Sequence, residues 1–268
     1  MKFGCWVISL DEQCKQTQTL LAALRQQGID ASVFHGVDGR QGLPPLQGRE
    51  KINKSQSILR HQQMLTSSQV GCYLSHYRVI KKAYDEGYDR ICILEDDAIL
   101  EDKFGEGVNR LIDLPEEYEM TRLMALKIRK RKVIKPLFDD CNSHDLVRPE
   151  RGWCGAQGYI LSRPGMKKIL DNGGDLFEPI DKLYDHFFEF DLKLYGVEPH
   201  LLYEQREESN IKKTPPSKPY MGVVLKIGFH LYKGFRSLKR HLYLNRFRNE
   251  FYPTSKPKGR PGRTERMK

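Results

Sequence analysis

The chain has 268 residues, of which 39% are hydrophobic and 30% charged; this is enough for one domain of about 220 residues and an appendage. No run approaches about 18 apolar residues, and the N-terminus lacks the length and cleavage site of a signal peptide, so we expect neither a spanning helix nor a secretory leader. The net charge of +10 is concentrated in residues 221–268, which carry +11 and leave −1 for residues 1–220. The six cysteines form no CxxC pair and favour free thiols in a reducing cytoplasm.

The first 35 residues are predicted to form a βαβ unit. Residues 3–10 and 29–34 have the apolar, β-branched composition of strands, and residues 14–27 between them show helical periodicity that ends at Gly28. A turn-rich stretch then leads into a polar region that reaches Ser68, which we expect to be a loop with short helical pieces.

Residues 71–87 are predicted to form a helix that ends at Gly87, and residues 91–94 form a buried strand directly after it. The remaining expected elements are a strand at 123–128, the basic run at 129–132 (a solvated loop, or less often a phosphate or sugar contact), a strand at 159–161 followed by a helix capped by Ser162, a helix at 179–190 and a strand at 201–203.

Prolines 215, 216 and 219 mark the end of a catalytic domain assigned to residues 1–214. Residues 215–252 are predicted to form a basic amphipathic helix, and residues 253–268 a disordered basic tail. Apolar residues recur at helical spacing, with basic residues largely opposite: Val224, Ile227, Leu231, Phe235, Leu238 and Leu242 against Lys226, Lys233, Arg236 and Arg240. This pattern fits an anionic membrane surface, and packing against the domain is the alternative.

Three adjacent carboxylates, Glu95, Asp96 and Asp97, follow the strand at 91–94 without a spacer. They repel one another and cannot enter an apolar core unpaired, so we expect them at a strand end that opens onto a cleft. Mg²⁺ or Mn²⁺ together with a phosphate-bearing substrate would neutralise them. Residues i and i+2 of an extended strand end point to the same side, so Glu95 and Asp97 can face one metal–diphosphate complex. A solvated acidic turn is the alternative.

The segment Gly71-Cys72-x-x-Ser75-His76, followed by Ile93-Leu94-Glu95-Asp96-Asp97, resembles the signature of family 25 glycosyltransferases, which include lipooligosaccharide galactosyltransferases of Gram-negative bacteria and collagen-modifying relatives. Further pieces agree in order over residues 3–211: Val7-Ile8-Ser9-Leu10, Val37-Asp38-Gly39, Gly158 to Ser162, Pro179-x-Asp181, Gln205 and Ser209-x-Ile211. The chain departs from the family at Gln69-Val70, at Gly155 to Tyr159, and after the first strand, where an expected arginine is missing and Lys15 is the nearest cation.

The resemblance implies a Rossmann-like α/β fold of the GT-A type, with a mostly parallel central sheet flanked by helices. It also implies an inverting transfer from a UDP-sugar, with galactose as the sugar and Mn²⁺ (or Mg²⁺) as cofactor. Asp97 is the first candidate for the metal, with Glu95, and either Glu95 or Asp96 would meet the ribose. Ser9, Leu10, Asp38 and Gly39 would line the uridine end.

Such a transfer needs a base within hydrogen-bond reach of the acceptor hydroxyl. Asp181 fills the family's Pro-x-Asp position, and Asp185, one helical turn on, is the second candidate. His76 is placed at the donor site and interpreted chiefly as a hydrogen-bonding brace behind the carboxylates. His186 is interpreted as a partly exposed histidine rather than a metal ligand. Trp153 and Tyr159 suit either sugar stacking or the core.

The acceptor would be a lipid-linked glycan of lipooligosaccharide or lipopolysaccharide, with the protein in the cytoplasm on the inner face of the bacterial inner membrane. A metal-dependent phosphohydrolase or nucleotidyltransferase would also place acids at a strand end. A nucleic-acid-binding protein would explain the basic tail, although residues 1–220 carry −1 and no nucleic-acid-binding motif is present.

Overall fold

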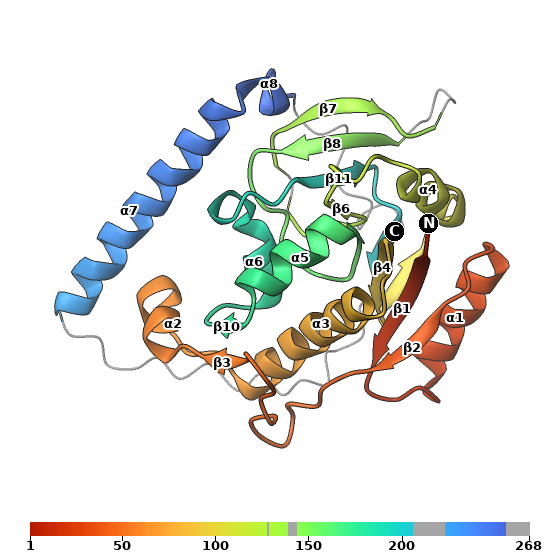
Figure 1. The fold of residues 1–268 in the computed structure, drawn as a ribbon, viewed down its shortest axis with the longest axis horizontal. Helices are drawn as coiled ribbons and strands as arrows, with labels where there is room; N and C mark the ends of the chain where they lie inside the picture. The colour runs from red at the N-terminus through yellow and green to blue at the C-terminus, as the bar shows by residue number, and fades with distance from the viewer. Residues whose placement is uncertain (128, 139–143, 206–222, 256–268) are drawn as a thin grey trace.

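The computed structural model describes residues 1–127, 129–138, 144–205 and 223–255, and its centre is an eight-stranded sheet (Figure 1). Two strands, β9 and β8, run opposite to the other six, because each pairs antiparallel with both of its neighbours. The predicted α/β class with a mostly parallel sheet is therefore confirmed. In order across the sheet, the strands are β2 (Ser32–His35), β1 (Phe3–Ser9), β4 (Arg90–Glu95), β9 (Gly158–Ser162), β6 (Met120–Arg122), β11 (Leu194–Glu198), β8 (Asp145–Pro149) and β7 (Arg131–Pro136).

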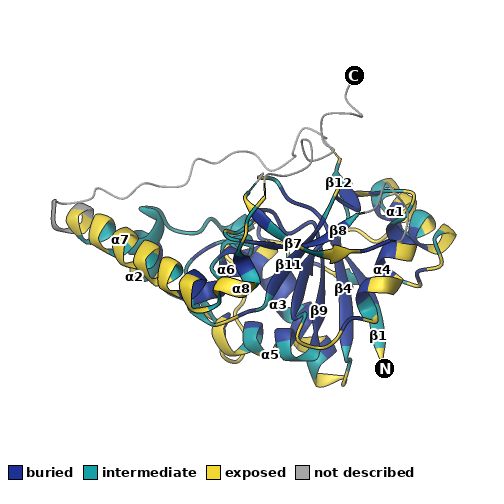
Figure 2. Ribbon diagram, turned by 90° about the horizontal axis from the view of Figure 1, so that it is seen from above, coloured by how far each residue is buried: buried dark blue, intermediate teal, exposed yellow. Residues whose placement is uncertain are grey.

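Helices cover both faces of the sheet, and the strands between them are buried (Figure 2). The alternation of side chains in β4 explains why both faces are needed: Ile91 and Ile93 enter one core layer, and Cys92 and Leu94 enter the other. On the first face lie α3 (Ser67–Asp85), α5 (Arg163–Asn172) and α6 (Ile180–Asp185), and on the second lie α1 (Lys15–Gln26) and α4 (Phe104–Ile112).

Short elements complete the domain. β3 (Lys51–Ile52) pairs with β10 (Asp175–Leu176), and β5 (Ala98–Leu100) pairs with β12 (Leu202–Glu204). The remaining helical pieces are α2 (Lys54–His61), the 3-10 turn η1 (Phe187–Glu189) and α8 (Arg248–Phe251). The pairing of β12 with β5 brings the chain after residue 204 back beside the acidic turn that follows β4.

The predicted βαβ unit, the strand at 91–94 and the helix capped by Ser162 are confirmed. The helix predicted at 71–87 begins four residues earlier, because Thr66 and Gln69 form a capping box. The strand predicted at 123–128 is wrong, since the strand there is Met120–Arg122. The helix predicted at 179–190 stops at Asp185 and gives way to η1.

Helix α7 (Val223–Arg246) lies along one side of the domain and packs against α2 (Figure 1). Tyr243 and Leu244 are buried in the core, the Tyr243 hydroxyl donates to Asp191 at 2.7 Å, and Arg60 donates to the Tyr232 hydroxyl at 2.9 Å. The opposite side of α7 is an apolar stripe whose members are 55–71% exposed: Ile227, Leu231, Phe235, Leu238 and Leu242.

No described helix is both long enough and apolar enough to cross a membrane. Several predicted features lie outside the described residues: Ser209, Ile211, the prolines at 215–219, and residues 256–268 of the basic tail. Within the described part of that tail, Ser255 forms a β-bridge with Arg131.

Candidate active site

The candidate active site lies where β2, β1 and β4 end at the same edge of the sheet. The chain crosses from β1 to β2 on one side and later returns to β4 on the other, so β1 and β4 flank a topological switch point. Open α/β sheets bind ligands at such points, outside the carboxyl ends of the strands. Ser9 ends β1, Glu95 ends β4, and Asp96 and Asp97 form the turn that follows.

Gly71 and Ser75 of the family-like segment fix the loop after β2 against α3. The Val37 amide donates to the Ser75 hydroxyl at 2.7 Å, and that hydroxyl donates to the Gly71 carbonyl at 2.8 Å. A Cβ on Gly71 would lie 2.5 Å from the Val37 carbonyl oxygen, and one on Gly39 would lie 2.0 Å from the Ser67 carbonyl oxygen. Only glycine permits this approach, which explains both residues in structural terms.

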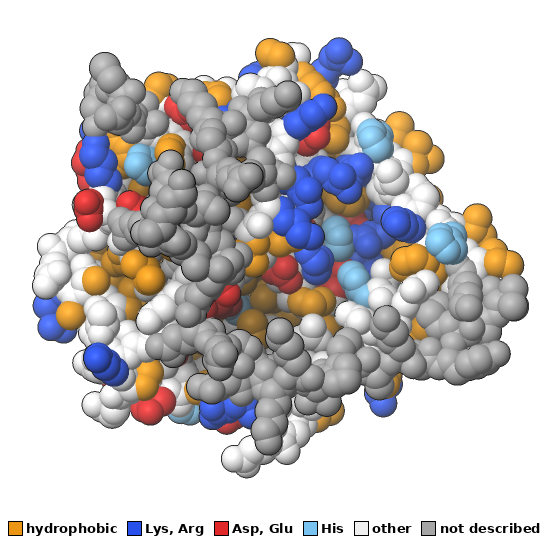
Figure 3. Space-filling view, turned by 180° about the vertical axis from the view of Figure 1, so that it is seen from behind, with side chains coloured by type: hydrophobic (Ala, Val, Ile, Leu, Met, Phe, Trp, Pro, Cys, Tyr) orange, Lys and Arg blue, Asp and Glu red, His pale blue; other side chains and the backbone are white. Residues whose placement is uncertain are grey.

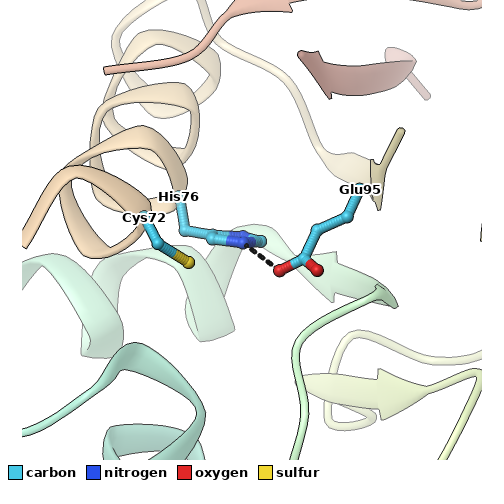
Figure 4. Close-up of side chains that lie close together, drawn as sticks. All are labelled: Cys72, His76 and Glu95. Atoms are coloured by element: carbon cyan, nitrogen blue, oxygen red, sulfur yellow. Dashed lines mark hydrogen bonds and ion pairs between the residues drawn. The ribbon is translucent and has the colours of Figure 1, made fainter. Parts of the chain in front are cut away.

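His76 braces Glu95 from behind, as the sequence analysis proposed. Its Nε2 lies 3.1 Å from Glu95 Oε1 and its Nδ1 lies 2.8 Å from the Tyr159 hydroxyl, which is 3.0 Å from the Tyr184 hydroxyl. Figure 4 shows Cys72, His76 and Glu95 pointing toward one another. His76 is buried at 1% exposure, so its contact with a ligand would run through Glu95.

Asp96 turns to the opposite side from Glu95. Its Oδ2 accepts a hydrogen bond of 2.6 Å from Ser9 Oγ, which lies 2.8 Å from Thr17 Oγ1. Asp96 also lines a pocket beside α1, here called the Lys15 pocket, with Lys15, Gln16, Thr19, Leu20, Ala23, Ala98, Ile99, Leu100 and Gln205. Lys15, the cation nearest to the position of the family's missing arginine, therefore lines the same pocket as Asp96.

Asp97 carries the most perturbed carboxyl of the turn. Burial, and then the charges of Glu95, Glu204 and Asp96, raise the pKa of Asp97 from 3.8 to about 8. Its Oδ1 is buried and has no hydrogen-bond partner among the described residues. The neighbouring negative charges oppose ionisation of Asp97, and its Oδ1 lacks a hydrogen-bond donor. A bound cation would compensate for both.

Across the cleft, Asp181 and Asp185 of α6 are held by the loop that precedes β9. The Gly155 amide donates to Asp181 at 3.2 Å and the Cys154 amide donates to Asp185 at 3.1 Å. Both loop residues have positive φ, +58° at Cys154 and +79° at Gly155, which turns the two amides toward α6. This loop therefore fixes the position of the two acids, which the sequence identified as candidates only through a short motif.

The two acids differ in their charge partners. Asp185 is 9% exposed and lies 3.2 Å from Lys182 and 3.9 Å from Arg122. Asp181 is 22% exposed and lies 3.5 Å from Lys182. Desolvation lowers the pKa of Lys182, but the charges of Asp185 and Asp181 outweigh it and raise that pKa. Asp181 is thus the more accessible acid, and Asp185 is largely neutralised inside the protein.

Cys72 lies between the two sets of acids. It is solvent-exposed, yet the groups crowded around it desolvate its thiol, and this effect, followed by the charges of Glu95, Asp181 and Asp97, raises the Cys72 pKa well above its usual range. The charges of Glu95, Asp97 and Asp181 therefore all act on the Cys72 thiol, which brings the acids of the β4 end and Asp181 to one part of the molecule.

Three groups of side chains were tested for a divalent cation. Cys154, Asp181 and Asp185 have ligand atoms within 4.8 Å of one another, but Lys182 and Arg122 already neutralise them. Cys72, His76 and Glu95 are equally close, but a thiol and an imidazole suit zinc rather than Mg²⁺ or Mn²⁺, which prefer oxygen ligands. Asp97 with Glu95 fits best, because both supply oxygen ligands and the negative charge around Asp97 is uncompensated.

The other predicted site residues have plainer roles. Asp38 is bound by Arg40, whose Nη2 lies 2.7 Å away; the Arg40 hydrogen bonds lower the Asp38 pKa. The Leu10 side chain packs close to Gly36. Trp153 is 3% exposed and packs against Gly196, so sugar stacking is wrong for it and for the fully buried Tyr159. His186 Nδ1 lies 3.0 Å from Glu178 Oε1, not in the metal site.

Arg122, Lys182 and the bend at Cys154–Gly155 were not predicted from the sequence. Arg122 is 1% exposed and donates to the Cys154 carbonyl at 3.0 Å, so it supports the loop from below. Its only sequence signal was an arginine within an apolar stretch. The signal at Lys182 was its position one residue after Asp181.

An acidic turn at a switch point, with an accessible acid across the cleft, is typical of α/β enzymes that act on phosphorylated substrates through a cation. The chain belongs to glycosyltransferase family 25. The family model, described as glycosyltransferase family 25 (LPS biosynthesis protein), matches residues 3–184.

Relatives of known description come from animals and bacteria. Procollagen galactosyltransferase 2 of Homo sapiens is 25% identical over 225 residues, 74% of this chain and 34% of that protein. Lipooligosaccharide biosynthesis protein lic2B of Haemophilus influenzae is 27% identical over 204 residues, 72% of this chain and 69% of that protein. A probable inactive glycosyltransferase 25 family member 3 of Rattus norvegicus is 30% identical over 225 residues, 73% of this chain and 37% of that protein. The chain thus spans about a third of the length of these animal relatives.

Proposed function

We propose that this protein is a metal-dependent inverting glycosyltransferase that moves galactose from UDP-galactose to a lipooligosaccharide or lipopolysaccharide acceptor at a membrane surface. Family membership supports the reaction class. The collagen galactosyltransferase relatives support the sugar, and the Haemophilus relative supports the acceptor.

The observation that carries the proposal is the uncompensated carboxyl of Asp97, with its buried, unpartnered Oδ1 beside Glu95. Asp97 and Glu95 would hold Mn²⁺ or Mg²⁺, and a bound cation would stabilise the negative charge that builds on the diphosphate as UDP departs. His76 keeps Glu95 oriented through the 3.1 Å contact. Asp96, Ser9 and the Lys15 pocket would contact the nucleoside end of the donor.

Asp181 is the proposed base. In an inverting transfer the acceptor hydroxyl oxygen attacks the anomeric carbon, the bond from that carbon to UDP breaks, and the hydroxyl proton passes to the base. Asp181 retains exposed surface and faces the same space as Glu95 and Asp97. Asp185 holds the loop and the two cations beside it in place instead.

The apolar stripe of α7 is the proposed membrane contact. Five large apolar side chains gather on one exposed face of the helix, which scattered surface residues do not explain, and a helix lying in the membrane interface buries such a face. The acceptor would then meet the site beside the membrane that carries it, on the cytoplasmic face of the bacterial inner membrane. No role for nucleic acid is needed.

The test is calorimetric titration of UDP into wild type, Asp97→Ala and Asp102→Ala, with and without Mn²⁺. Asp102 is an exposed acid five residues away and serves as the matched control. Metal-dependent binding that only Asp97→Ala abolishes is the expected result, to be followed by sugar transfer assays with UDP-galactose. Absence of UDP binding by the wild type, or release of free sugar regardless of acceptor, would contradict the proposal.

A further inference from the structure

A strongly basic pocket lies beside the proposed base, between α7 and the loops that precede β9 and follow β6. Its volume is about 280 Å³, near the lower end of ligand sites, which begin at about 300 Å³. Seven of its thirteen lining residues are Lys or Arg: Lys127, Arg129, Arg151, Lys182, Lys233, Arg236 and Arg240. Figure 3 shows Lys and Arg side chains gathered on this face next to acidic side chains in a hollow.

Most of this positive charge has no counter-ion within the described part of the chain. Lys182 pairs with Asp185, and Arg236 donates to Glu189 at 2.7 Å. The other five cations form no ion pair among the described residues: Lys127, Arg129, Arg151, Lys233 and Arg240. Like charges held this close oppose one another, so the arrangement favours an anion between them.

Arg240 gives the second, independent observation. Its Nε is buried and has no hydrogen-bond partner among the described residues, although a guanidinium in protein is normally satisfied. Desolvation, then the charge of Arg151, lowers the Arg240 pKa, and Glu150 only partly offsets this. An oxyanion bound between Arg240 and Arg151 would satisfy the donor and relieve the repulsion at once.

The pocket is a fixed structure rather than a set of loose surface side chains. Arg129 Nε donates to the Gly152 carbonyl at 3.3 Å, and a Cβ on Gly152 would lie 2.0 Å from the Asp185 carboxyl carbon. On the helix side, Glu189 holds both Arg236 of α7 and Arg60 of α2. Four chain segments are thereby locked around one space.

The position of the pocket indicates which substrate would use it. Asp97, Glu95 and Asp96 lie at the ends of β4 and β1, whereas the pocket begins at Asp185 and extends toward α7. Asp181 lies 3.5 Å from Lys182, which lines the pocket, so a sugar whose hydroxyl meets Asp181 would reach the pocket. The donor's diphosphate belongs with the acidic turn, and the basic pocket is left for the acceptor.

The orientation of α7 favours an acceptor group over a membrane lipid as the ligand of the basic pocket. Lys233, Arg236 and Arg240 line the pocket on the side of α7 that faces the domain, while the apolar stripe faces away from it. If the stripe enters the membrane interface, these three cations turn toward the protein, away from lipid headgroups. This revises the expectation that the basic face of the helix itself binds an anionic membrane.

We propose that this basic pocket binds a phosphate or carboxylate group carried by the acceptor glycan, and so selects anionic acceptors. The inference rests on the proposed function for its acceptor, but anion binding by the pocket can be measured without any transfer reaction. The two claims can therefore fail separately.

The first experiment is ligand-observed NMR of the full chain with glucose 6-phosphate and with glucose. Wild type should bind the phosphate and not the neutral sugar, and Arg151→Gln/Arg240→Gln should lose this binding. Arg246→Gln, on the same helix outside the pocket, and Asp97→Ala should both retain it. Absence of binding, equal binding by the double variant, or loss in Asp97→Ala would each overturn the proposal, the last by placing the anion at the donor site.

The second experiment separates acceptor from lipid and from catalysis. With matched phosphorylated and dephosphorylated acceptors, the double variant should raise the acceptor KM about ten- to a hundredfold for the phosphorylated one only, as expected for losing charge-assisted hydrogen bonds. The KM for UDP-galactose should not change. If instead the double variant weakens binding to phosphatidylglycerol vesicles and leaves the acceptor KM unaltered, lipid is the ligand and the proposal is wrong. If glucose 6-phosphate binds but no sugar is transferred, the proposal for the basic pocket stands and only the proposed function is refuted.

Discussion

Replacing Asp97 with asparagine should stabilise the metal-free protein at high pH. The folded-state pKa of about 8 exceeds the ordinary 3.8, so the folded protein holds this proton more tightly than the unfolded chain does. An acid with a raised pKa favours the folded state at low pH, and that contribution is lost as pH rises from about 4 to 8. Above pH 8 the wild type bears the full cost of the ionised carboxylate, and Asp97→Asn does not.

The shift sets an upper limit of about 6 kcal/mol, at 1.36 kcal/mol per pKa unit. Asp97 is only partly buried, and solvent screening reduces the cost of its charge, so we expect about 2 to 3 kcal/mol at pH 8.5. This corresponds to a rise in Tm of roughly 4 to 10 °C for a domain of this size. At pH 3.5 to 4, where Asp97 stays protonated, the two proteins should be nearly equal.

The assay is urea denaturation and calorimetry of wild type, Asp97→Asn and the exposed control Asp102→Asn at both pH values, without metal. Saturating Mn²⁺ and UDP should then reverse the order, because only the wild type gains binding free energy. If wild type and Asp97→Asn were equally stable at pH 8.5, and Mn²⁺ with UDP did not make the wild type the more stable protein, two claims would be refuted. These are that ionised Asp97 destabilises the metal-free protein and that Asp97 binds a cation.

Three further variants test other parts of the molecule. Asp181→Asn should lower kcat by about 10²- to 10⁴-fold without changing UDP affinity, whereas Asp185→Asn should chiefly lower stability. Kinetics and urea denaturation of both variants test this, and the reverse pattern would exchange the roles of the two acids. Leu231→Glu should reduce co-sedimentation with phosphatidylglycerol vesicles and leave Tm unaltered, because Leu231 is 71% exposed; unchanged co-sedimentation would exclude the stripe. Gly71→Ala should cost about 1 to 3 kcal/mol in urea denaturation, since its Cβ would lie 2.5 Å from the Val37 carbonyl oxygen; a neutral result would mean that the loop yields freely.

The sequence was sufficient to predict the parts of the fold where local signals agree. The strand before Glu95 is continuously apolar, and the helix before it has clear periodicity and a glycine stop, so both were located within a few residues. In the large sheet, strands β7, β8 and β11 were missed. The prediction of a solvated loop at 129–132 was wrong in its second half, since Arg131 and Lys132 lie in β7 and Arg131 is buried. Arg148 of β8 is fully buried and donates to the Leu194 carbonyl at 2.6 Å, so a charged residue interrupts the apolar pattern that marks a strand.

The candidate site was predictable only in its short-range part. Glu95 and Asp97 are two residues apart, and their charge coupling follows from adjacency. Their placement relative to Asp181 depends on the antiparallel β9 and on two positive-φ residues before it, Cys154 and Gly155. Cys154 is not a residue type that usually marks a left-handed turn, so no local pattern indicated the bend.

Helix α7 shows why composition alone was ambiguous about the basic tail. The two predicted alternatives, membrane contact and packing on the domain, apply to different faces of one helix. Tyr232, Tyr243 and the pocket-lining Arg240 face the domain, and the stripe containing Leu231 and Phe235 is exposed. A helix that packs through its polar and aromatic side leaves its apolar side free for another surface. The inward cations line one pocket with Lys182, which lies 3.5 Å from the proposed base Asp181. The same helix would therefore fix the enzyme on the membrane and complete the acceptor site, so mutations on its two faces should affect vesicle binding and acceptor KM independently.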